Sequence, residues 1–380
     1  MKKRADVVIG ANYGDEGKGH TVDALAFLNP GGYGLRINGG CQAGHTVTRN
    51  GIKHVFRQLS SASFHFYTTI LTKDFIVEPL LLKKEMDCLR NVGVELASPI
   101  IDHRCLVTTP WHIAANRCNK TTLAHGSCGL GINETITSNE HFPFCIQDFT
   151  NTDMAISKLR ALEQSYKNVY ENEFELGLFK MPFEIEGTDK FSVEQYVKHV
   201  QSFLSEFELR IELYDLMTLN DGKYPIICEA SQGLGLDQNI GEFPHVTRSN
   251  TGFRNLKELD LDLEYHINYT SRYYLTRHGE GPMDNCIGNF WKSDLDPTNV
   301  SNEYQGTMRY GILNANKLKN RIQQDSVDHV NVASRKLIVN CLDYFEDFKI
   351  DKFIYHDEVQ ELNPHTISSI LNDIVFKNNY

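Results

Sequence analysis

The chain has 380 residues, of which 41% are hydrophobic and 23% are charged, and its formal net charge is −11. This composition is typical of a globular protein with one large domain or two smaller ones, and the acidic balance argues against a nucleic-acid polymer as a partner. Residues 1–4 are basic, but the apolar run after them is too short for a signal peptide. A membrane-spanning helix needs about 18 consecutive apolar residues, and the sequence contains no such run, so no membrane span is predicted. Nine scattered cysteines without a C-x-x-C pair indicate reduced thiols in the cytoplasm.

The first predicted strand covers residues 7–9, and a glycine-rich turn separates it from a helix predicted over residues 22–28. A strand, a glycine-rich turn and a helix N-terminus together present backbone N–H groups to a phosphate, which Lys18 could also reach. Asp15 and Glu16 lie within the turn, where a carboxylate is costly beside a phosphate unless it holds Mg²⁺ or moves a proton. The spacing differs from that of the common G-x-x-x-x-G-K-[ST] loop, so an ordinary tight turn is the alternative.

A second glycine-rich loop, N-G-G-C-Q-A-G-H-T, follows a strand predicted at residues 34–37. Its histidine, His45, stands between a glycine and a threonine, and glycine allows the backbone to approach a ligand closely. Loops that follow parallel strands share one edge of a sheet, so His45 is a candidate for catalysis rather than for a surface role. A hairpin is predicted over residues 47–57, with its turn at Asn50 and Gly51.

The middle of the chain is predicted to alternate strands with helices. The expected strands cover residues 68–72 and 99–108, and the expected helices cover residues 79–92 and 111–119. A third glycine-rich loop, H-G-S-C-G-L-G-I, covers residues 125–132. Residues 150–220 are mostly amphipathic, with helices expected at 154–170 and 193–207, and predict a helical cap or subdomain.

Polar motifs follow the later predicted strands. E-A-S-Q-G follows a strand at residues 224–228, and T-R-H-G-E-G-P overlaps the end of a strand at 267–276. Polar groups at the end of a buried strand favour ligand contact. The remaining expected elements are a helix at 314–322, a strand at 336–342 that ends in Asp343, a strand near Phe353 and a helix at about 365–376. The chain therefore predicts one α/β domain over residues 1–380, with a mostly parallel central sheet flanked by helices and a P-loop-like nucleotide site.

The motifs G-D-E-G-K-G, A-G-H-T, E-A-S-Q-G, V-T-R-S-N-T and T-R-H-G-E-G-P, in this order, resemble those of the adenylosuccinate synthetase family from residue 7 to about residue 355. The resemblance implies a ligase that joins aspartate to C6 of a purine mononucleotide after a nucleoside triphosphate has phosphorylated the 6-oxygen. Asp15 would take the N1 proton of the purine and ligate Mg²⁺. His45 would donate a hydrogen bond to the developing oxyanion.

The resemblance also implies binding roles for individual residues. The residues expected at the triphosphate are Gly14, Glu16, Gly17, Lys18, Gly19, Gly44, Thr46 and Asp343. Those expected at the mononucleotide are Asn12, Gln42, Ser127, Cys128, Gln232, Leu236, Thr247 and His278. Thr307 and Arg309 would bind aspartate, with Arg277 nearby, and the Gly44 carbonyl would be a further ligand of Mg²⁺. The family also implies a cytoplasmic homodimer.

Several positions depart from the family pattern. Cys128 replaces a threonine and is the weaker hydrogen-bonding group, Gln42 replaces an asparagine, and His278 replaces a smaller apolar residue. Residues 137–144 contain no arginine, although the family has one near this point that reaches the partner subunit's nucleotide. The arginine-rich aspartate loop keeps only Arg309, the C-terminal G-x-G-P segment is missing, and T-K-L-D has become N-C-L-D.

These departures surround the nucleotide and the phosphoryl donor, whereas Asp15 and His45 remain, and this combination favours a changed substrate. The chain resembles a short bacteriophage branch that condenses aspartate with dGMP, takes ATP or dATP as donor, and leads to 2-aminoadenine in DNA. A divergent enzyme that uses IMP and GTP is the alternative, and Asp343 leaves a guanine donor open. Two further alternatives are a nucleotide-binding regulator without turnover and an unrelated loop NTPase.

Overall fold

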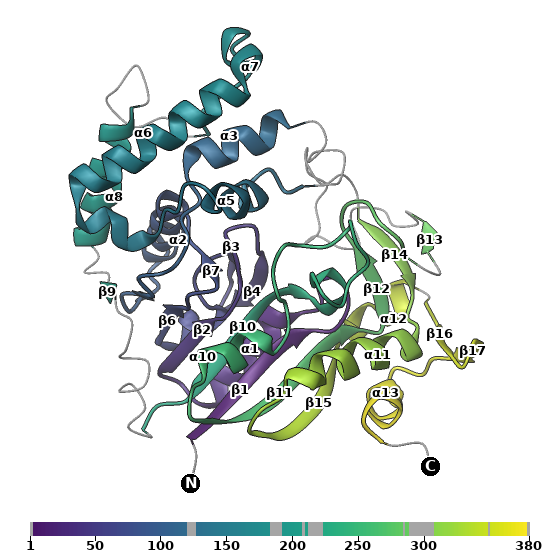
Figure 1. The fold of residues 1–380 in the computed structure, drawn as a ribbon. Coiled ribbons are helices and arrows are strands. Elements are labelled where there is room, and N and C mark those ends of the chain that lie inside the picture. The colour runs from purple at the N-terminus through teal and green to yellow at the C-terminus, as the bar shows by residue number, and fades with distance from the viewer. Residues whose placement is uncertain are drawn as a thin grey trace.

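The computed structural model describes residues 3–119, 127–182, 192–206, 210–211, 223–283, 286–288, 308–348 and 350–377. Its centre is an eight-stranded sheet in which all neighbouring strands run parallel (Figure 1). From edge to edge the strands are β15 (Val332–Asn340), β11 (Leu263–Arg272), β1 (Lys3–Gly10), β10 (Ile226–Gly233), β2 (Gly32–Arg36), β6 (Tyr67–Leu71), β8 (Ile100–Ile101) and β9 (Arg210–Ile211). The predicted α/β class and parallel sheet are therefore confirmed.

Helices and small sheets surround this centre. The helices of the described residues are α1 (Lys18–Leu28), α2 (Pro79–Asn91), α3 (Pro110–Cys118), α5 (Ile132–Asn139), α6 (Thr152–Val169), α7 (Glu171–Glu175), α8 (Val193–Glu206), α10 (Arg254–Leu259), α11 (Ala315–Asp325), α12 (Phe345–Phe348) and α13 (Ile367–Phe376). The smaller sheets pair β3 (Gly39–Gly40) with β7 (Phe75–Ile76), β4 (His45–Arg49) with β5 (Ile52–Phe56), and β16 (Lys352–Tyr355) with β17 (Glu358–Glu361). In a fourth, which has three strands, β14 (Arg309–Ile312) lies between β12 (Tyr274–Arg277) and β13 (Cys286–Gly288). None of the helices in the described ranges combines the length and apolarity needed to cross a membrane.

Strand β1 is buried on both of its faces, which explains its continuous apolar sequence. Val7 and Ile9 belong to the largest hydrophobic cluster, together with side chains of α10, α11 and α13. Val8 points the other way and packs with Val22 and Ala26 of α1. Because β1 lies between β10 and β11, the loop at its carboxyl end leaves the sheet near the middle.

The helices α2, α3, α6 and α8 share a second hydrophobic cluster. In Figure 1, α6, α7 and α8 gather at the upper left, on the opposite side of the molecule from α11 and α13. The helices predicted at 154–170 and 193–207 are confirmed as α6 and α8. Residues 183–191, 207–209 and 212–222 lie outside the described part of the chain, and the subdomain boundary at 150–220 stays a prediction.

Two predicted strands differ from the structure. The strand expected at 99–108 is wrong beyond Ile101, because Asp102 begins a turn: its side chain accepts the Arg104 N–H at 2.9 Å, and its carbonyl accepts the Cys105 N–H. The strand expected at 267–276 is divided at Tyr273. The part before it, β11, joins the central sheet, and the part after it, β12, pairs antiparallel with β14.

Strand β10 is longer than its sequence predicts. The apolar run ends at Cys228, but the strand continues to Gly233. Glu229, Ser231 and Gln232 therefore belong to the strand itself, and its parallel partners are β1 and β2. This extension carries polar side chains into the centre of the carboxyl edge of the sheet.

Candidate active site

The polar motifs come together at the carboxyl edge of the sheet. The β1–α1 loop follows β1, the loop with His45 follows β2, and Gln232 lies at the end of β10. His278 follows the short strand β12, which continues the chain from β11, and Asp343 lies just beyond β15. These strands are adjacent in the order β15-β11-β1-β10-β2, and the carboxyl edge of a parallel sheet is the usual position of a ligand site.

Glu16 organises the β1–α1 loop from within. Its buried carboxylate accepts the backbone N–H groups of Asn12 at 2.7 Å and Gly14 at 3.1 Å. The Lys18 ammonium lies 3.4 Å from the other carboxylate oxygen, and its side chain is buried as well. Burial raises the pKa of Glu16, although Lys18 and the two N–H groups oppose the shift. A Cβ at Gly10 would lie only 2.9 Å from the Lys18 Nζ, so this packing requires a glycine there.

Helix α1 begins at the loop and close to His45. Gly17 precedes the helix with a left-handed φ of 81°, and a Cβ there would lie 2.7 Å from the Asn340 Nδ2. That amide donates to the Glu16 carbonyl at 2.7 Å and so links the end of β15 to the loop. A Cβ at Gly19 would lie 2.9 Å from the Cβ of His45. The helix N-terminus and the histidine are therefore direct neighbours.

Asp15 is held in place through its backbone, and its carboxylate is partly exposed at the site. Its φ of 56° is unusual for a residue other than glycine, and the Arg272 Nε donates to its carbonyl. The side chain is 30% exposed, and its Oδ2 lies 3.7 Å from the His278 Nε2. The Nδ1 of His278 is buried, and no residue in the described part of the chain forms a hydrogen bond with it. The structure thus brings Asp15 and His278 together.

His45 is paired with a buried carboxylate. Its Nδ1 lies 2.5 Å from the Glu229 Oε1, and both side chains are buried. Glu229 also accepts hydrogen bonds from the Ser60 hydroxyl at 2.9 Å, the Ser61 N–H at 2.9 Å and the Ser61 hydroxyl at 2.6 Å. Burial alone would raise the pKa of Glu229, but the nearby Arg36 and these donors lower it. The carboxylate orients the imidazole through Nδ1, so Nε2 remains for a ligand.

Arg36 supplies the buried positive charge that balances Glu229. Its guanidinium donates to the Leu59 carbonyl at 2.9 Å and to the Ser231 hydroxyl at 2.8 Å. Glu229 belongs to the E-A-S-Q-G motif, but the motif alone predicts no role for it, and no motif marks Arg36, Arg272 or Asn340 as functional. A glutamate at the end of a buried strand, next to a loop that carries a histidine, was the available signal for Glu229.

Three of the predicted mononucleotide residues lie around the end of β10. Gln232 has a φ of 60°, and its amide nitrogen lies 3.5 Å from the Thr247 hydroxyl. Thr247 also donates its backbone N–H to the Leu236 carbonyl at 2.8 Å. The side-chain oxygens of Gln232 and Gln42 are buried and have no hydrogen-bond partner among the described residues. Such acceptors require donors to offset the loss of water, and a ligand can supply them.

Helices α3 and α5 hold the loop that contains Ser127 and Cys128. The Ser127 hydroxyl donates to the Asn116 Oδ1 at 2.9 Å, and the Asn116 amide donates to the Glu134 Oε2 at 2.7 Å. The Arg117 Nε donates to the Gly129 carbonyl at 3.1 Å. Burial raises the pKa of Cys128 to about 11, so its thiol is neutral near pH 7. Residues 120–126, which precede this loop, lie outside the described part of the chain.

The remaining predicted residues have different surroundings. The Asn12 side chain bonds to protein groups at both ends, accepting from Arg321 at 2.8 Å and donating to Ser271 at 2.9 Å. Arg309 donates to the carbonyls of Gly281 at 2.8 Å and Gly279 at 2.7 Å. Of the residues predicted at the triphosphate, Gly44 and Asp343 are exposed and Thr46 is partly buried. Thr307 lies outside the described residues, so the predicted aspartate site is described only at Arg309.

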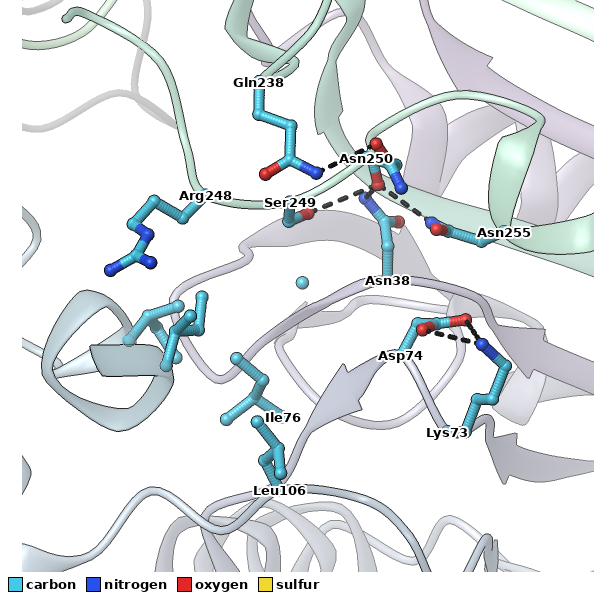
Figure 2. Close-up of a pocket in the computed structure, with 13 residues that line it drawn as sticks. Asn38, Lys73, Asp74, Ile76, Leu106, Gln238, Arg248, Ser249, Asn250 and Asn255 are labelled. Carbon is cyan, nitrogen blue, oxygen red and sulfur yellow. Dashed lines mark hydrogen bonds and ion pairs between the residues drawn. The ribbon is translucent and has the colours of Figure 1, made fainter. Parts of the chain in front are cut away.

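A pocket of about 210 Å³ adjoins this region, between the 248–250 segment and α5 (Figure 2). Asn250 is its organising residue, because its carbonyl accepts from the Asn38 amide at 2.9 Å and the Asn255 amide at 2.8 Å. The lining residues are Asn38, Gly39, Lys73, Asp74, Ile76, Leu106, Ile132, Ile136, Gln238, Arg248, Ser249, Asn250 and Asn255. Arg248 directly follows Thr247, so the pocket borders the predicted mononucleotide residues.

Known proteins of one family match this chain. A family model described as adenylosuccinate synthetase covers residues 7–370. The adenylosuccinate synthetase of Francisella philomiragia is 30% identical over 292 aligned residues, which cover 73% of this chain and 64% of the relative. That of Chlorobium chlorochromatii is 28% identical over 258 aligned residues, which cover 65% and 55%. The chain therefore spans only 55–64% of the length of these two relatives.

Two solved structures share the fold. The fully ligated adenylosuccinate synthetase of Plasmodium falciparum has a TM-score of 0.70 and 17% identity, with 95% of this chain and 83% of that chain covered. The succinoaminodeoxyadenylate synthetase (PurZ) of cyanophage S-2L, bound to dGMP and dATP, has a TM-score of 0.58 and 13% identity. Its coverage is 98% of this chain and 100% of that chain. At these identities the similarity establishes the fold.

Proposed function

The chain belongs to the adenylosuccinate synthetase family, and from this premise we propose that it is a C–N bond-forming ligase that joins L-aspartate to C6 of a purine mononucleotide. The observation that carries the proposal is the meeting of two loops. The β1–α1 loop holds Asp15 and Lys18, and His45, oriented by Glu229, lies against the first turn of α1. A phosphate-binding loop next to an oriented imidazole suits phosphoryl transfer to an oxygen that gains negative charge.

The proposed reaction has two steps. Asp15 takes the N1 proton of the purine, the 6-oxygen attacks the γ-phosphorus of the triphosphate, and the bond to the β-phosphate oxygen breaks to release the diphosphate. When His45 is doubly protonated beside the Glu229 carboxylate, which accepts from Nδ1, it donates a hydrogen bond from Nε2 to the developing oxyanion. The aspartate amine then attacks C6, phosphate leaves with the electrons of the C6–O bond, and the amine loses a proton. The backbone of Gly17 and Gly19 and the Lys18 ammonium hold the triphosphate.

The donor set of this loop fits Mg²⁺. That ion is usually held by one or two carboxylates together with substrate phosphates and water, and Asp15 is a partly exposed carboxylate beside a phosphate-binding loop. We propose Asp15 and the Gly44 carbonyl as its protein ligands. When bound, Mg²⁺ neutralises charge on the phosphates.

We further propose dGMP as the mononucleotide and ATP or dATP as the donor. The support is chemical: the unpartnered buried oxygens of Gln42 and Gln232 suit a ligand with hydrogen-bond donors, and guanine carries a 2-amino group that hypoxanthine lacks. His278 beside Asp15, and Cys128 in place of a threonine, give this site an unusual polarity. A protein of the same fold is bound to dGMP and dATP.

An enzyme that uses IMP and GTP is the second candidate. It is favoured by the relatives in sequence, which are adenylosuccinate synthetases, and by Asp343, which is exposed just beyond β15 and could accept hydrogen bonds from a guanine. For either substrate we propose a homodimer in the cytoplasm. The mass of the protein in solution, measured by light scattering, tests the dimer.

A substrate-exchange assay tests the proposed function. The protein is mixed with Mg²⁺ and aspartate, with dGMP, GMP or IMP as acceptor and ATP, dATP or GTP as donor, and products are identified by mass. A succinyl adduct from dGMP with ATP or dATP is expected. An adduct from IMP and GTP alone would support the second candidate. Triphosphate hydrolysis that does not require aspartate, or no adduct in any mixture, would contradict the ligase assignment.

A further inference from the structure

Tyr13, in the β1–α1 loop, is held by two arginines from distant parts of the chain. The Arg277 guanidinium carbon lies 4.5 Å from the centre of the Tyr13 ring, and that of Arg321 lies 4.6 Å from it. Both distances are within the range of cation–π attraction. The ring is 7% exposed, so these contacts occur where water screens them little. We call these three residues the tyrosine clamp.

Arg321 also grips the loop by hydrogen bonds. Its Nη2 donates to the Tyr13 hydroxyl at 2.7 Å, and its Nη1 donates to the Asn12 Oδ1 at 2.8 Å. One planar guanidinium therefore reaches two consecutive residues of the loop from α11. A lysine has no such fork and could replace only one of the two bonds. The Asn12 amide donates onward to the Ser271 hydroxyl at 2.9 Å, which fixes the loop to β11.

Arg277 connects the clamp to the turn that carries His278. It donates to the Pro282 carbonyl at 2.7 Å and to the His245 carbonyl at 2.9 Å. The next residue, His278, lies 3.7 Å from the Asp15 carboxylate. Tyr13 thus lies between α11 and the 277–282 turn. Asp15 follows it two residues later in the same loop, and His278, which lies close to Asp15, belongs to that turn.

We infer that Arg321 and Arg277 are positioning residues, which hold Tyr13 so that the β1–α1 loop presents Asp15 in its reactive orientation. The loop has a reason to need this support. Asp15 has a left-handed φ of 56°, a conformation that costs about 1–3 kcal/mol and persists only where neighbours enforce it. Arg272 holds the Asp15 carbonyl on one side, and the tyrosine clamp holds Asn12 and Tyr13 on the other. This inference rests on the proposed function, because the orientation matters for proton transfer to Asp15.

The test compares Arg321→Met, Arg321→Lys and Tyr13→Phe with Gln323→Ala, an exposed residue of the same helix. A small misplacement of a reactive group costs up to about a hundredfold in rate. We expect Arg321→Met to lower kcat by about ten- to a hundredfold and to change the KM for triphosphate by less than about threefold. Arg321→Lys should recover part of kcat, since it restores one bond. Gln323→Ala should match the unaltered protein.

The double variant Arg321→Met/Tyr13→Phe provides a second measure. If the two residues act as one unit, it should lose no more kcat than Arg321→Met alone. A kcat of Arg321→Met equal to that of the unaltered enzyme would overturn the inference, and so would equal fractional losses in Arg321→Met and Gln323→Ala. If Arg321→Met does not fold, Arg321→Lys and Tyr13→Phe provide the test. Each should then lower kcat and leave the KM for triphosphate nearly unchanged, and an unchanged kcat in both would overturn the inference.

Hydrogen exchange separates this inference from the proposed function. If the unaltered protein makes no adduct, the proposed function fails, but exchange at the amides of residues 12–16 still reports the clamp. We then expect these amides to exchange at least about tenfold faster in Arg321→Met than in Gln323→Ala. Equal exchange in the two variants would overturn the clamp whether or not the protein is a ligase.

Discussion

Glu229 is the side chain on which the orientation of His45 depends. It is fully buried and accepts four hydrogen bonds, from His45, from Ser60 and twice from Ser61. Its lowered pKa means that it stays ionised while the nearby Arg36 is in place. A carboxylate that accepts a hydrogen bond from Nδ1 fixes the orientation of the imidazole ring and directs Nε2 toward the ligand.

Glu229→Gln should therefore impair both stability and catalysis. The amide keeps the shape, but its NH₂ faces hydrogen-bond donors, and Arg36 loses the stronger of its two nearby negative charges, Glu229 and Glu85, at a cost of about 3–5 kcal/mol. Urea unfolding measures this loss, and product formation below the unfolding transition should fall at least about tenfold. The control is Ser60→Ala, which removes one of the donors to Glu229 and the cap that this hydroxyl provides for the Ala62 N–H, and should cost about 1–2 kcal/mol. Unchanged turnover in Glu229→Gln would contradict the assigned role of the carboxylate.

Glu78 makes stability depend on pH. It caps α2 by accepting the Leu81 N–H, and its Oε1 has no hydrogen-bond partner among the residues that the structure describes. Burial raises its pKa from 4.5 to about 8. Between these pH values the unfolded chain has lost this proton and the folded chain retains it. Raising the pH therefore favours unfolding, by at most about 1.4 kcal/mol per pH unit.

Glu78→Gln should remove that dependence, because the amide keeps an acceptor for the cap and has no proton to lose. We expect the difference in free energy of unfolding, Glu78→Gln minus the unaltered protein, to increase steadily from pH 5 to pH 8. Denaturant titrations at both pH values measure it, with exposed Glu95→Gln as the matched control. A difference that does not change with pH would show that Glu78 ionises normally.

At the scale of elements, the junction between β1, α1 and β15 requires a glycine at position 17. Gly17→Ala would add the cost of a left-handed alanine, about 1 kcal/mol, and would also push the Asn340 amide from the Glu16 carbonyl. Gly31→Ala is a matched control, because Gly31 has a φ of 78° and open space around it. Both variants should lose stability in thermal unfolding, but only Gly17→Ala should weaken triphosphate binding by about tenfold or more. Equal affinities would contradict the role of this junction.

The same elements show how far local sequence specifies the fold. The strand–turn–helix at residues 3–28 and the hairpin at Asn50-Gly51 were predictable, because an apolar run and a positive-φ turn act locally. The division of one expected strand at Tyr273 was not, since only pairing with β14, more than thirty residues later, separates β12 from β11. Strand β10 extended past its apolar run for a similar reason: β1 and β2 on either side supply the hydrogen bonds.

Across the whole molecule, the candidate site combines positions that are far apart in sequence. His45 and Glu229 are separated by 184 residues, and Asn12 and Arg321 by 309. Motifs predicted Asp15, Lys18 and His45 as candidates, because loops after parallel strands share an edge. Of the partners that orient them, only Glu229 had a local signal, as a glutamate at the end of a buried strand, and the order of strands in the sheet brings it to His45.

Because the site joins distant parts of the chain, ligands bound there should stabilise the whole protein against unfolding. Mg²⁺ should be needed for stabilisation by the triphosphate and not for stabilisation by the mononucleotide. A ligand at a hundred times its Kd stabilises the folded state by about 2.7 kcal/mol, which should raise the Tm of a protein of this size by about 3 °C. If Asp15 and Gly44 hold Mg²⁺ against the triphosphate, ATP should raise the Tm with Mg²⁺ and not with EDTA. The mononucleotide dGMP should raise it under both conditions, because its proposed contacts, such as Gln42 and Gln232, involve no metal.

Asp15→Asn sharpens this measurement, because the amide keeps the size of the side chain and loses the charge that attracts Mg²⁺. Differential scanning calorimetry of this variant should show the dGMP shift unchanged and the ATP shift reduced to its value in EDTA. An ATP shift that survives EDTA in the unaltered protein would mean that Lys18 and the N-terminus of α1 bind the triphosphate without a metal. Loss of the dGMP shift in Asp15→Asn would instead mean that binding of the mononucleotide, and not only transfer of its N1 proton, depends on the charge of this carboxylate.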